Sequence, residues 1–247
     1  MIPSSPRRTW IFLLVSSLAF WGPDLLLPSN WQHSHLYPVL SNIYQGLLVV
    51  AWFLFGPALC RSMVENEIRS GPLYQSVHQA LAELEQSTRT PRLAVLPVTL
   101  IEQPELFILT AGLLPGRSEV FLSSELIAPL GPDGLRFLLA RAMAHGEWPQ
   151  RLVALIPVLI LTVAFPDLSD WRAWLNMSGW LVAWLVLHWS FELLVDRRAA
   201  QAMGPGAVQG LKEVMAASAT RLGWLSMRPP ERWRLQFIQR MAPGSTN

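Results

Sequence analysis

An uncharged apolar segment from Pro38 to Cys60 constrains this chain more than any other feature. The segment contains no Asp, Glu, Lys or Arg, and Trp52, Phe53 and Phe55 lie among its leucines and valines. A helix needs about 20 predominantly apolar residues to cross the hydrocarbon core of a bilayer. Only 15% of the whole chain is charged, against about 25% in soluble domains. The segment therefore predicts a membrane-spanning helix.

Further apolar segments extend this prediction to about four hydrophobic segments in all, judged by length and lack of charge. Thr9–Leu27 is interrupted only by Asp24, and Ala173–Phe191 carries no formal charge. Leu152–Pro166 is shorter, and it is compatible with a short span, a re-entrant segment or a buried core helix. In chain order the segments form two hairpins. We therefore predict a multi-span α-helical membrane protein.

Arginine placement predicts the orientation of these hairpins, because basic residues accumulate on the cytoplasmic side of a membrane. The arginines that flank the predicted spans are Arg7, Arg8, Arg61, Arg69, Arg151, Arg197 and Arg198. We expect both termini in the cytoplasm and a location in the bacterial inner (cytoplasmic) membrane. The predicted units are an N-terminal transmembrane hairpin at 1–60, a cytoplasmic part at 61–151, a second transmembrane or re-entrant hairpin at 152–191, and cytoplasmic C-terminal helices at 192–247.

The predicted cytoplasmic segments combine helical and strand patterns. Helical periodicity occurs at 73–87, from about Leu135, at 206–222 and at 231–241, and strand patterns occur at Leu93–Leu100, Leu106–Thr110 and Glu119–Leu122. We therefore predict a small cytoplasmic α+β domain. The net charge of +2 gives no basis for binding nucleic acid. Cys60 is the only cysteine, which excludes an internal disulfide, and its apolar surroundings predict a small buried hydrophobe.

The segment at 231–241 allows two interpretations. Its apolar and basic residues are Trp233, Leu235, Phe237 and Ile238 with Arg232, Arg234 and Arg240. This mixture is typical of an amphipathic helix in the membrane interface. Packing of the same helix against the cytoplasmic domain is equally compatible with the pattern.

Four short motifs resemble those of a known family. They are Glu119–Ile127, Asp133–Ala140, Glu192–Asp196 and Arg228–Arg232, and their order relative to the apolar segments is similar to that of the membrane-embedded zinc metallopeptidases of the HtpX and CAAX prenyl protease type (peptidase family M48). In that family one helix bears His-Glu-x-x-His, and a later helix supplies a Glu as the third zinc ligand. The resemblance implies a metallopeptidase-like α+β domain.

The chain departs from the family at the catalytic motif. Arg141 and Ala142 stand where the family has its first histidine and its glutamate, and only His145 and Glu192 remain at ligand positions. A guanidinium stays protonated and cannot donate a lone pair to a metal. Two protein ligands fall short of the three usual at a catalytic zinc. We therefore predict a pseudoenzyme without a cofactor, in which Arg141 occupies the vacated metal position and forms an ion pair with Glu192.

An alternative retains zinc with relocated ligands. His188 and Glu192 are four residues apart on one predicted helix, so together with His145 they offer three ligands. Glu147 or Asp196 would then serve as the general base. This alternative predicts an active membrane metallopeptidase in membrane protein quality control.

The pseudoenzyme interpretation predicts a structural, adaptor or assembly subunit of a larger membrane complex. A peptidase groove binds an extended chain along a sheet edge, and Val120, Phe121 and Leu122 are our candidates for that contact. We expect the partners to be other integral membrane proteins, in addition to the lipid bilayer. A transporter or channel is disfavoured, because Asp24 and His188 are almost the only ionisable residues in the predicted spans.

Overall fold

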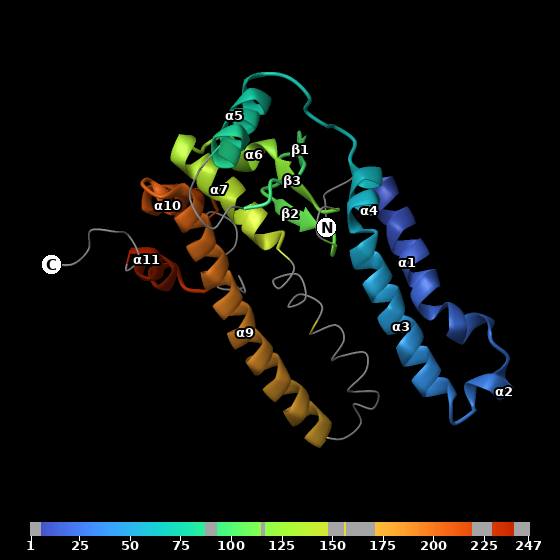
Figure 1. Ribbon diagram of the computed structural model, residues 1–247. Helices are drawn as coiled ribbons and strands as arrows, with labels where there is room; N and C mark the ends of the chain where they lie inside the picture. Colours follow the sequence, from blue (N-terminus) through green and yellow to red (C-terminus); the bar gives the residue numbers. More distant parts are fainter. Residues whose placement is uncertain are drawn as a thin grey trace.

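The computed structural model describes residues 6–86, 93–114, 117–147, 156, 171–218 and 229–239. The chain begins with helices α1 (Pro6–Leu26), α2 (Ser29–Gln32), α3 (Tyr37–Leu54), α4 (Gly56–Met63) and α5 (Pro72–Gln86). The strands are β1 (Val98–Ile101), β2 (Ile108–Ala111) and β3 (Glu119–Ser123). The later helices are α6 (Ser124–Ile127), α7 (Pro132–His145), α9 (Trp171–Met203), α10 (Ala207–Ser218) and α11 (Glu231–Gln239). The described structure is a mixed α+β fold, as predicted (Figure 1).

The strands form a single three-stranded sheet in the order β1-β3-β2. The central strand β3 pairs in parallel with β1 and antiparallel with β2. One face of the sheet contributes Leu100, Val120 and Leu122 to the main core, which also contains much of α7. On the opposite face Ile101, Ala111 and Phe121 form a smaller cluster. Cys60 of α4 is half-buried against this second cluster, in an apolar environment as predicted.

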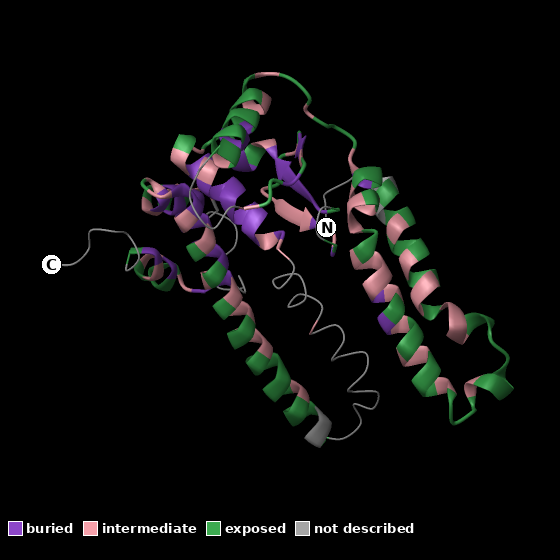
Figure 2. Cartoon of the chain, viewed as in Figure 1, coloured by how far each residue is buried: buried purple, intermediate pink, exposed green. Residues whose placement is uncertain are grey.

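Helices α3 and, from Trp174 onward, α9 are long and apolar enough to cross a membrane. The apolar part of α1, Trp10–Leu26, is shorter. Large apolar side chains are exposed along these three helices. Figure 2 colours most of α1 and α3 and the first part of α9 as exposed or intermediate. Among the described residues, two helices are long and apolar enough to span a membrane, so the prediction of about four such segments is supported only in part. Leu152–Pro166 falls outside those residues.

Two of the predicted apolar segments differ in extent from the helices that contain them. The apolar segment that ends at Cys60 is not one helix, because α3 ends at Leu54 and α4 begins at Gly56. Pro57 lies in the first turn of α4, where its missing N–H group costs no helical hydrogen bond, so it favours a new helix there over continuation of α3. In contrast, α9 does not end at Phe191 but continues without a break to Met203.

Helix α7 lies at the centre of the α+β fold and packs most extensively on α10 and α9. Its start is fixed by Glu213 of α10, whose Oε2 accepts hydrogen bonds from the backbone N–H groups of Gly131 (3.1 Å) and Gly134 (3.0 Å). A carboxylate at a helix N-terminus satisfies donors that otherwise have no intrahelical partner. At Gly210 of α10, a Cβ atom would clash with the carbonyl oxygen of Asp133. This close packing determines where the N-terminal half of α7 lies.

Candidate functional site

Helix α7 places two of the predicted site residues on one face. Arg141 is buried, and His145 follows four residues later at the end of the helix. Residues four apart lie one above the other on a helix, which is the arrangement that a His-Glu-x-x-His motif requires for two metal ligands. Arg141 and His145 thus keep the spacing of that motif, although an arginine stands where the motif has its first metal ligand.

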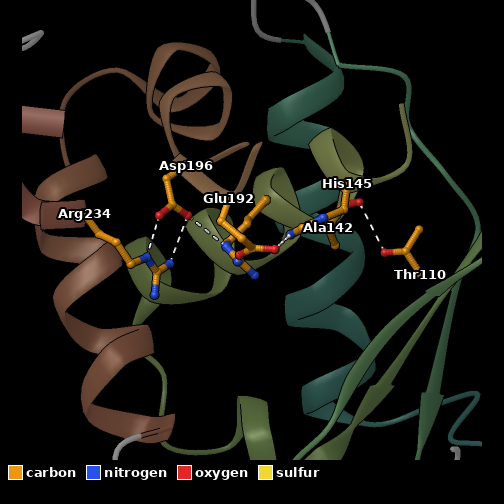
Figure 3. Close-up of polar contacts among 7 residues, drawn as sticks. Thr110, Ala142, His145, Glu192, Asp196 and Arg234 are labelled. Atoms are coloured by element: carbon orange, nitrogen blue, oxygen red, sulfur yellow. Dashed lines mark hydrogen bonds and ion pairs between the residues drawn. The ribbon is translucent and has the colours of Figure 1, made fainter. Parts of the chain in front are cut away.

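Helix α9 supplies the opposing carboxylates. Glu192 and Asp196 are both buried and lie one turn apart on the face of α9 that meets α7. The guanidinium of Arg141 donates from Nη2 to Oε2 of Glu192, and from Nε to Oδ1 of Asp196 at 2.8 Å. The predicted ion pair between Arg141 and Glu192 is therefore present, but Asp196 shares the same guanidinium (Figure 3).

A second arginine completes the cluster from the last helix. Arg234 of α11 donates from Nε to Oδ2 of Asp196 at 2.5 Å and from Nη2 to Oδ1 at 2.9 Å (Figure 3). This paired contact matches the planar guanidinium to the carboxylate plane. This role was not predicted from the sequence, in which Arg234 belongs to an amphipathic segment and Asp196 was a candidate only as an alternative base. The available signal was an arginine between apolar residues, which is costly to bury without an acidic partner.

The charges of this cluster balance. Two guanidinium groups face two carboxylates, and all four side chains are buried. Burial lowers the pKa of Arg141, but the charges of Glu192 and Asp196 outweigh this effect and hold its pKa above the ordinary value. Arg141 is therefore charged at every physiological pH. Charges removed from water are stable only when they are paired and hydrogen-bonded, so each member of the cluster depends on the others.

The remaining motif positions lie at the same place. Nε2 of His145 is 3.4 Å from Oε1 of Glu192. The backbone carbonyl of Ala142 accepts a hydrogen bond from Oγ1 of Thr110 at 3.4 Å (Figure 3). Residues 141, 145 and 192, which the sequence resemblance aligned with the three zinc ligands of the peptidase family, thus converge. Ala142 offers no proton acceptor on its side chain.

These residues do not fit a zinc ion. The carboxylate of Glu192 is engaged by a guanidinium that carries its own positive charge, so a cation at this position would meet repulsion from Arg141. Among the described residues, no three His, Cys, Asp or Glu side chains are grouped in a way that would hold a metal. His188 stacks on Trp184 with ring centroids 5.2 Å apart. The relocated set of His145, His188 and Glu192 gains no support from this arrangement.

The charged cluster borders a groove of about 420 Å³. Its walls come from the end of α3, the start of α4, strand β2 and the facing parts of α7 and α9. The apolar side of the groove includes Trp52, Phe53, Leu109 and Ala111, and its polar end includes Arg141, His145 and Glu192. The groove therefore offers an apolar channel that ends at a fixed guanidinium.

The partner-binding prediction named the wrong strand. Val120, Phe121 and Leu122 are completely buried in β3, which is paired on both sides and has no free edge. Strand order is a property of long-range pairing, so the alternation of residues in one strand does not reveal whether that strand is central. The outer strands of the sheet are β1 and β2.

The two edges of the sheet differ. The outer edge of β1 is covered, because Glu67 bridges to Ile101 and the Ile68 N–H group donates to the carbonyl of Leu100 at 2.8 Å. Residues of β2 line the groove, and the outer edge of β2 has no strand partner among the described residues. Comparisons with known protein families and with curated proteins found no match for this chain.

Proposed function

We propose that this chain is a membrane-anchored pseudopeptidase that performs no hydrolysis and binds an extended segment of a partner membrane protein. It would act as a structural, adaptor or assembly subunit of a larger membrane complex. One observation carries the proposal: the buried guanidinium of Arg141 contacts Glu192 at the point where His145 also reaches Glu192. A positive side chain occupies the centre at which a peptidase of the resembling family would hold its metal.

The loss of chemistry follows from the residue types. A catalytic zinc polarises the scissile carbonyl and lowers the pKa of a bound water to about 7. A guanidinium polarises a carbonyl through hydrogen bonds, but it does not bind and ionise water. Ala142 cannot accept the proton of an attacking water. The site therefore retains a means of holding a carbonyl oxygen and lacks a means of attacking the carbonyl carbon.

The open edge of β2 supports binding of an extended chain. The N–H group of Ser123 donates to the carbonyl of Phe107, which identifies these residues as a hydrogen-bonded antiparallel pair. Hydrogen-bonded and non-bonded pairs alternate along an antiparallel ladder. The backbone groups of Ile108 and Thr110 therefore point away from β3 and toward the groove. Strand addition at such an edge satisfies these donors and acceptors.

The exposed apolar helices support a location in the membrane. α3 and α9 meet the length and hydropathy that a span requires, and α3 supplies Trp52 and Phe53 to the wall of the groove. A soluble protein that left such surfaces uncovered would aggregate. A groove next to these helices is accessible to the juxtamembrane segments of other membrane proteins, and we expect its partners among them.

Elemental analysis and a cleavage assay test the loss of chemistry. We expect the purified wild-type chain to contain no stoichiometric zinc and to leave casein intact. The double variant Arg141→His/Ala142→Glu replaces the guanidinium with a ligand and supplies a base, so it is expected to take up about one equivalent of zinc. The single variant Ala142→Glu is the matched control and should take up none. Stoichiometric zinc with chelator-sensitive cleavage in the wild type would overturn the proposal.

Site-specific photo-crosslinking in membranes tests the groove. A photoreactive residue at Leu109 should capture a partner polypeptide, whereas the same residue at the exposed Val95 should not. Thr110→Pro removes one outward N–H group at an edge position that tolerates proline. We expect it to reduce capture about five-fold, corresponding to about 1 kcal/mol for one hydrogen bond. Thr110→Val keeps the N–H group and should capture normally, and equal capture by both variants contradicts edge binding.

A further inference from the structure

Helix α11 uses one face to dock and leaves another face exposed. Arg234 and Ile238 are buried, the first on Asp196 and the second in the main core. Trp233 remains 45% exposed, and Arg232 is exposed beside it. The sequence allowed either an interfacial helix or packing on the domain. The structure combines both, because the docked face and the outward face belong to the same turns of the helix.

The outward face lies where the apolar surface of α9 ends. Val186 is 59% exposed, and the next exposed apolar positions continue toward the start of α9, whereas Glu192 is buried in the domain. Trp189 lies between the exposed apolar part of α9 and its buried charged part. The ring of Trp189 meets that of Trp233 edge-on, with the ring centroids 5.9 Å apart. Figure 1 shows α11 beside α9, on the side away from α1 and α3. Tryptophan is enriched at membrane–water interfaces.

Two exposed arginines are close in sequence to the residues that dock α11. Arg197 follows Asp196 on α9, and Arg232 lies two residues before Arg234 on α11, next to Trp233 and on the side of α11 that faces away from the docked residue Arg234. Arg198, in comparison, is paired with Glu147. Glu231 is the acidic residue next to Arg232, and the net charge of the three exposed side chains, two arginines and one glutamate, remains positive.

We propose that Arg197, Arg232 and Trp233 form a binding site for the headgroup of an anionic phospholipid in the cytoplasmic leaflet. The indole of Trp233 would lie at the level of the glycerol backbone, and the two guanidinium groups would bind the phosphate. Arginine matches phosphate oxygens with paired hydrogen bonds, and the anionic cytoplasmic leaflet supplies the complementary charge. This inference rests on the proposed membrane location and is independent of the groove.

Lipid retained by the full-length protein tests the site. The chain is purified in a mild detergent, incubated with equimolar phosphatidylglycerol and phosphatidylcholine, and examined by native mass spectrometry. We expect the wild type to retain phosphatidylglycerol preferentially, and Arg197→Gln or Arg232→Gln to lower that preference about five-fold each, as about 1 kcal/mol per surface arginine predicts. Arg232→Lys should keep most of it. Arg69→Gln, which removes an exposed arginine after α4, is the matched control and should retain the wild-type preference.

The outcomes separate this proposal from the one above. Equal preference in the wild type, Arg197→Gln and Arg232→Gln would overturn the lipid site while leaving the groove untouched. Absence of any retained lipid in the wild type would overturn the lipid site and count against the membrane location. Thr110→Pro should not alter lipid preference, and a loss of preference in that variant would contradict the independence of the two sites.

Discussion

The two halves of α9 have opposite exposure patterns within one unbroken helix. In the half that begins at Trp171, large apolar side chains such as Val182 and Val186 face outward. In the half that ends at Met203, the charged residues Glu192 and Asp196 face inward. An ordinary surface helix has the reverse of both patterns. The comparison teaches that one half presents an apolar surface long enough to cross a membrane, whereas the other half buries carboxylates that need cationic partners.

The largest expected effect tests the inward charges. Asp196 is 0% exposed and holds two arginines, so Asp196→Ala leaves two buried guanidinium groups with a single carboxylate. We expect this variant to lose about 3–5 kcal/mol of unfolding free energy. Thermal unfolding in detergent measures the loss. Glu83→Gln breaks the more exposed pair with Arg136 and serves as the control, with an expected loss of under about 1 kcal/mol. Similar losses in both variants would contradict the prediction that the buried cluster contributes more to stability than an exposed ion pair.

The next effect tests the outward apolar half. Val182 is 62% exposed, so an arginine at this position costs nothing if the helix lies in water. In a bilayer the same change costs about 2.5–3.5 kcal/mol near the centre of a span. We expect Val182→Arg to reduce the fraction of protein that resists alkaline extraction from membranes, and Val182→Leu to leave it unchanged. Full membrane retention of the arginine variant would contradict the prediction that Val182 faces the hydrocarbon core of a bilayer.

The smallest effect compares two valines on the same helix. Val195 is 0% exposed in the domain, and Val186 is largely exposed. Val195→Ala removes two buried methyl groups and is expected to cost about 2 kcal/mol. Val186→Ala should change the free energy of unfolding by less than about 0.5 kcal/mol. Thermal unfolding of both variants under identical detergent conditions provides the measurement, and equal costs would show that Val186 is also enclosed by protein.

Local patterns predicted much of the fold. The strand patterns at Leu106–Thr110 and Glu119–Leu122 correspond closely to β2 and β3, and the helical periodicity at 73–87 corresponds to α5. Alternation and helical spacing are properties of neighbouring residues, so they are readable without knowledge of the fold. The order of the strands is not such a property. The assignment of β3 as the partner-binding edge failed for this reason.

The candidate site was predicted in part. Arg141 and Glu192 were expected to pair, because a motif position and a family resemblance identified both residues, and they do pair. The contribution of Asp196 and Arg234 was not expected, although Asp196 lies one turn beyond Glu192. Arg234 is far from Asp196 in the sequence and belongs to a different helix. Only the packing of α11 against α9 brings the two together.

The sequence by itself predicted about four apolar segments, two of which correspond to the helices α3 and α9 that are long enough to cross a membrane, and it placed Arg141 where the resembling family has a metal ligand. The first prediction follows from the composition of each segment, and the second follows from a motif resemblance within one helix. The tertiary structure decided which sheet edge stays open, which cations neutralise Glu192 and Asp196, and where α9 passes from an exposed apolar surface to a buried charged one. These depend on contacts between segments that are distant in the chain, and the free energy of burying a charge is set by such contacts rather than by local propensity.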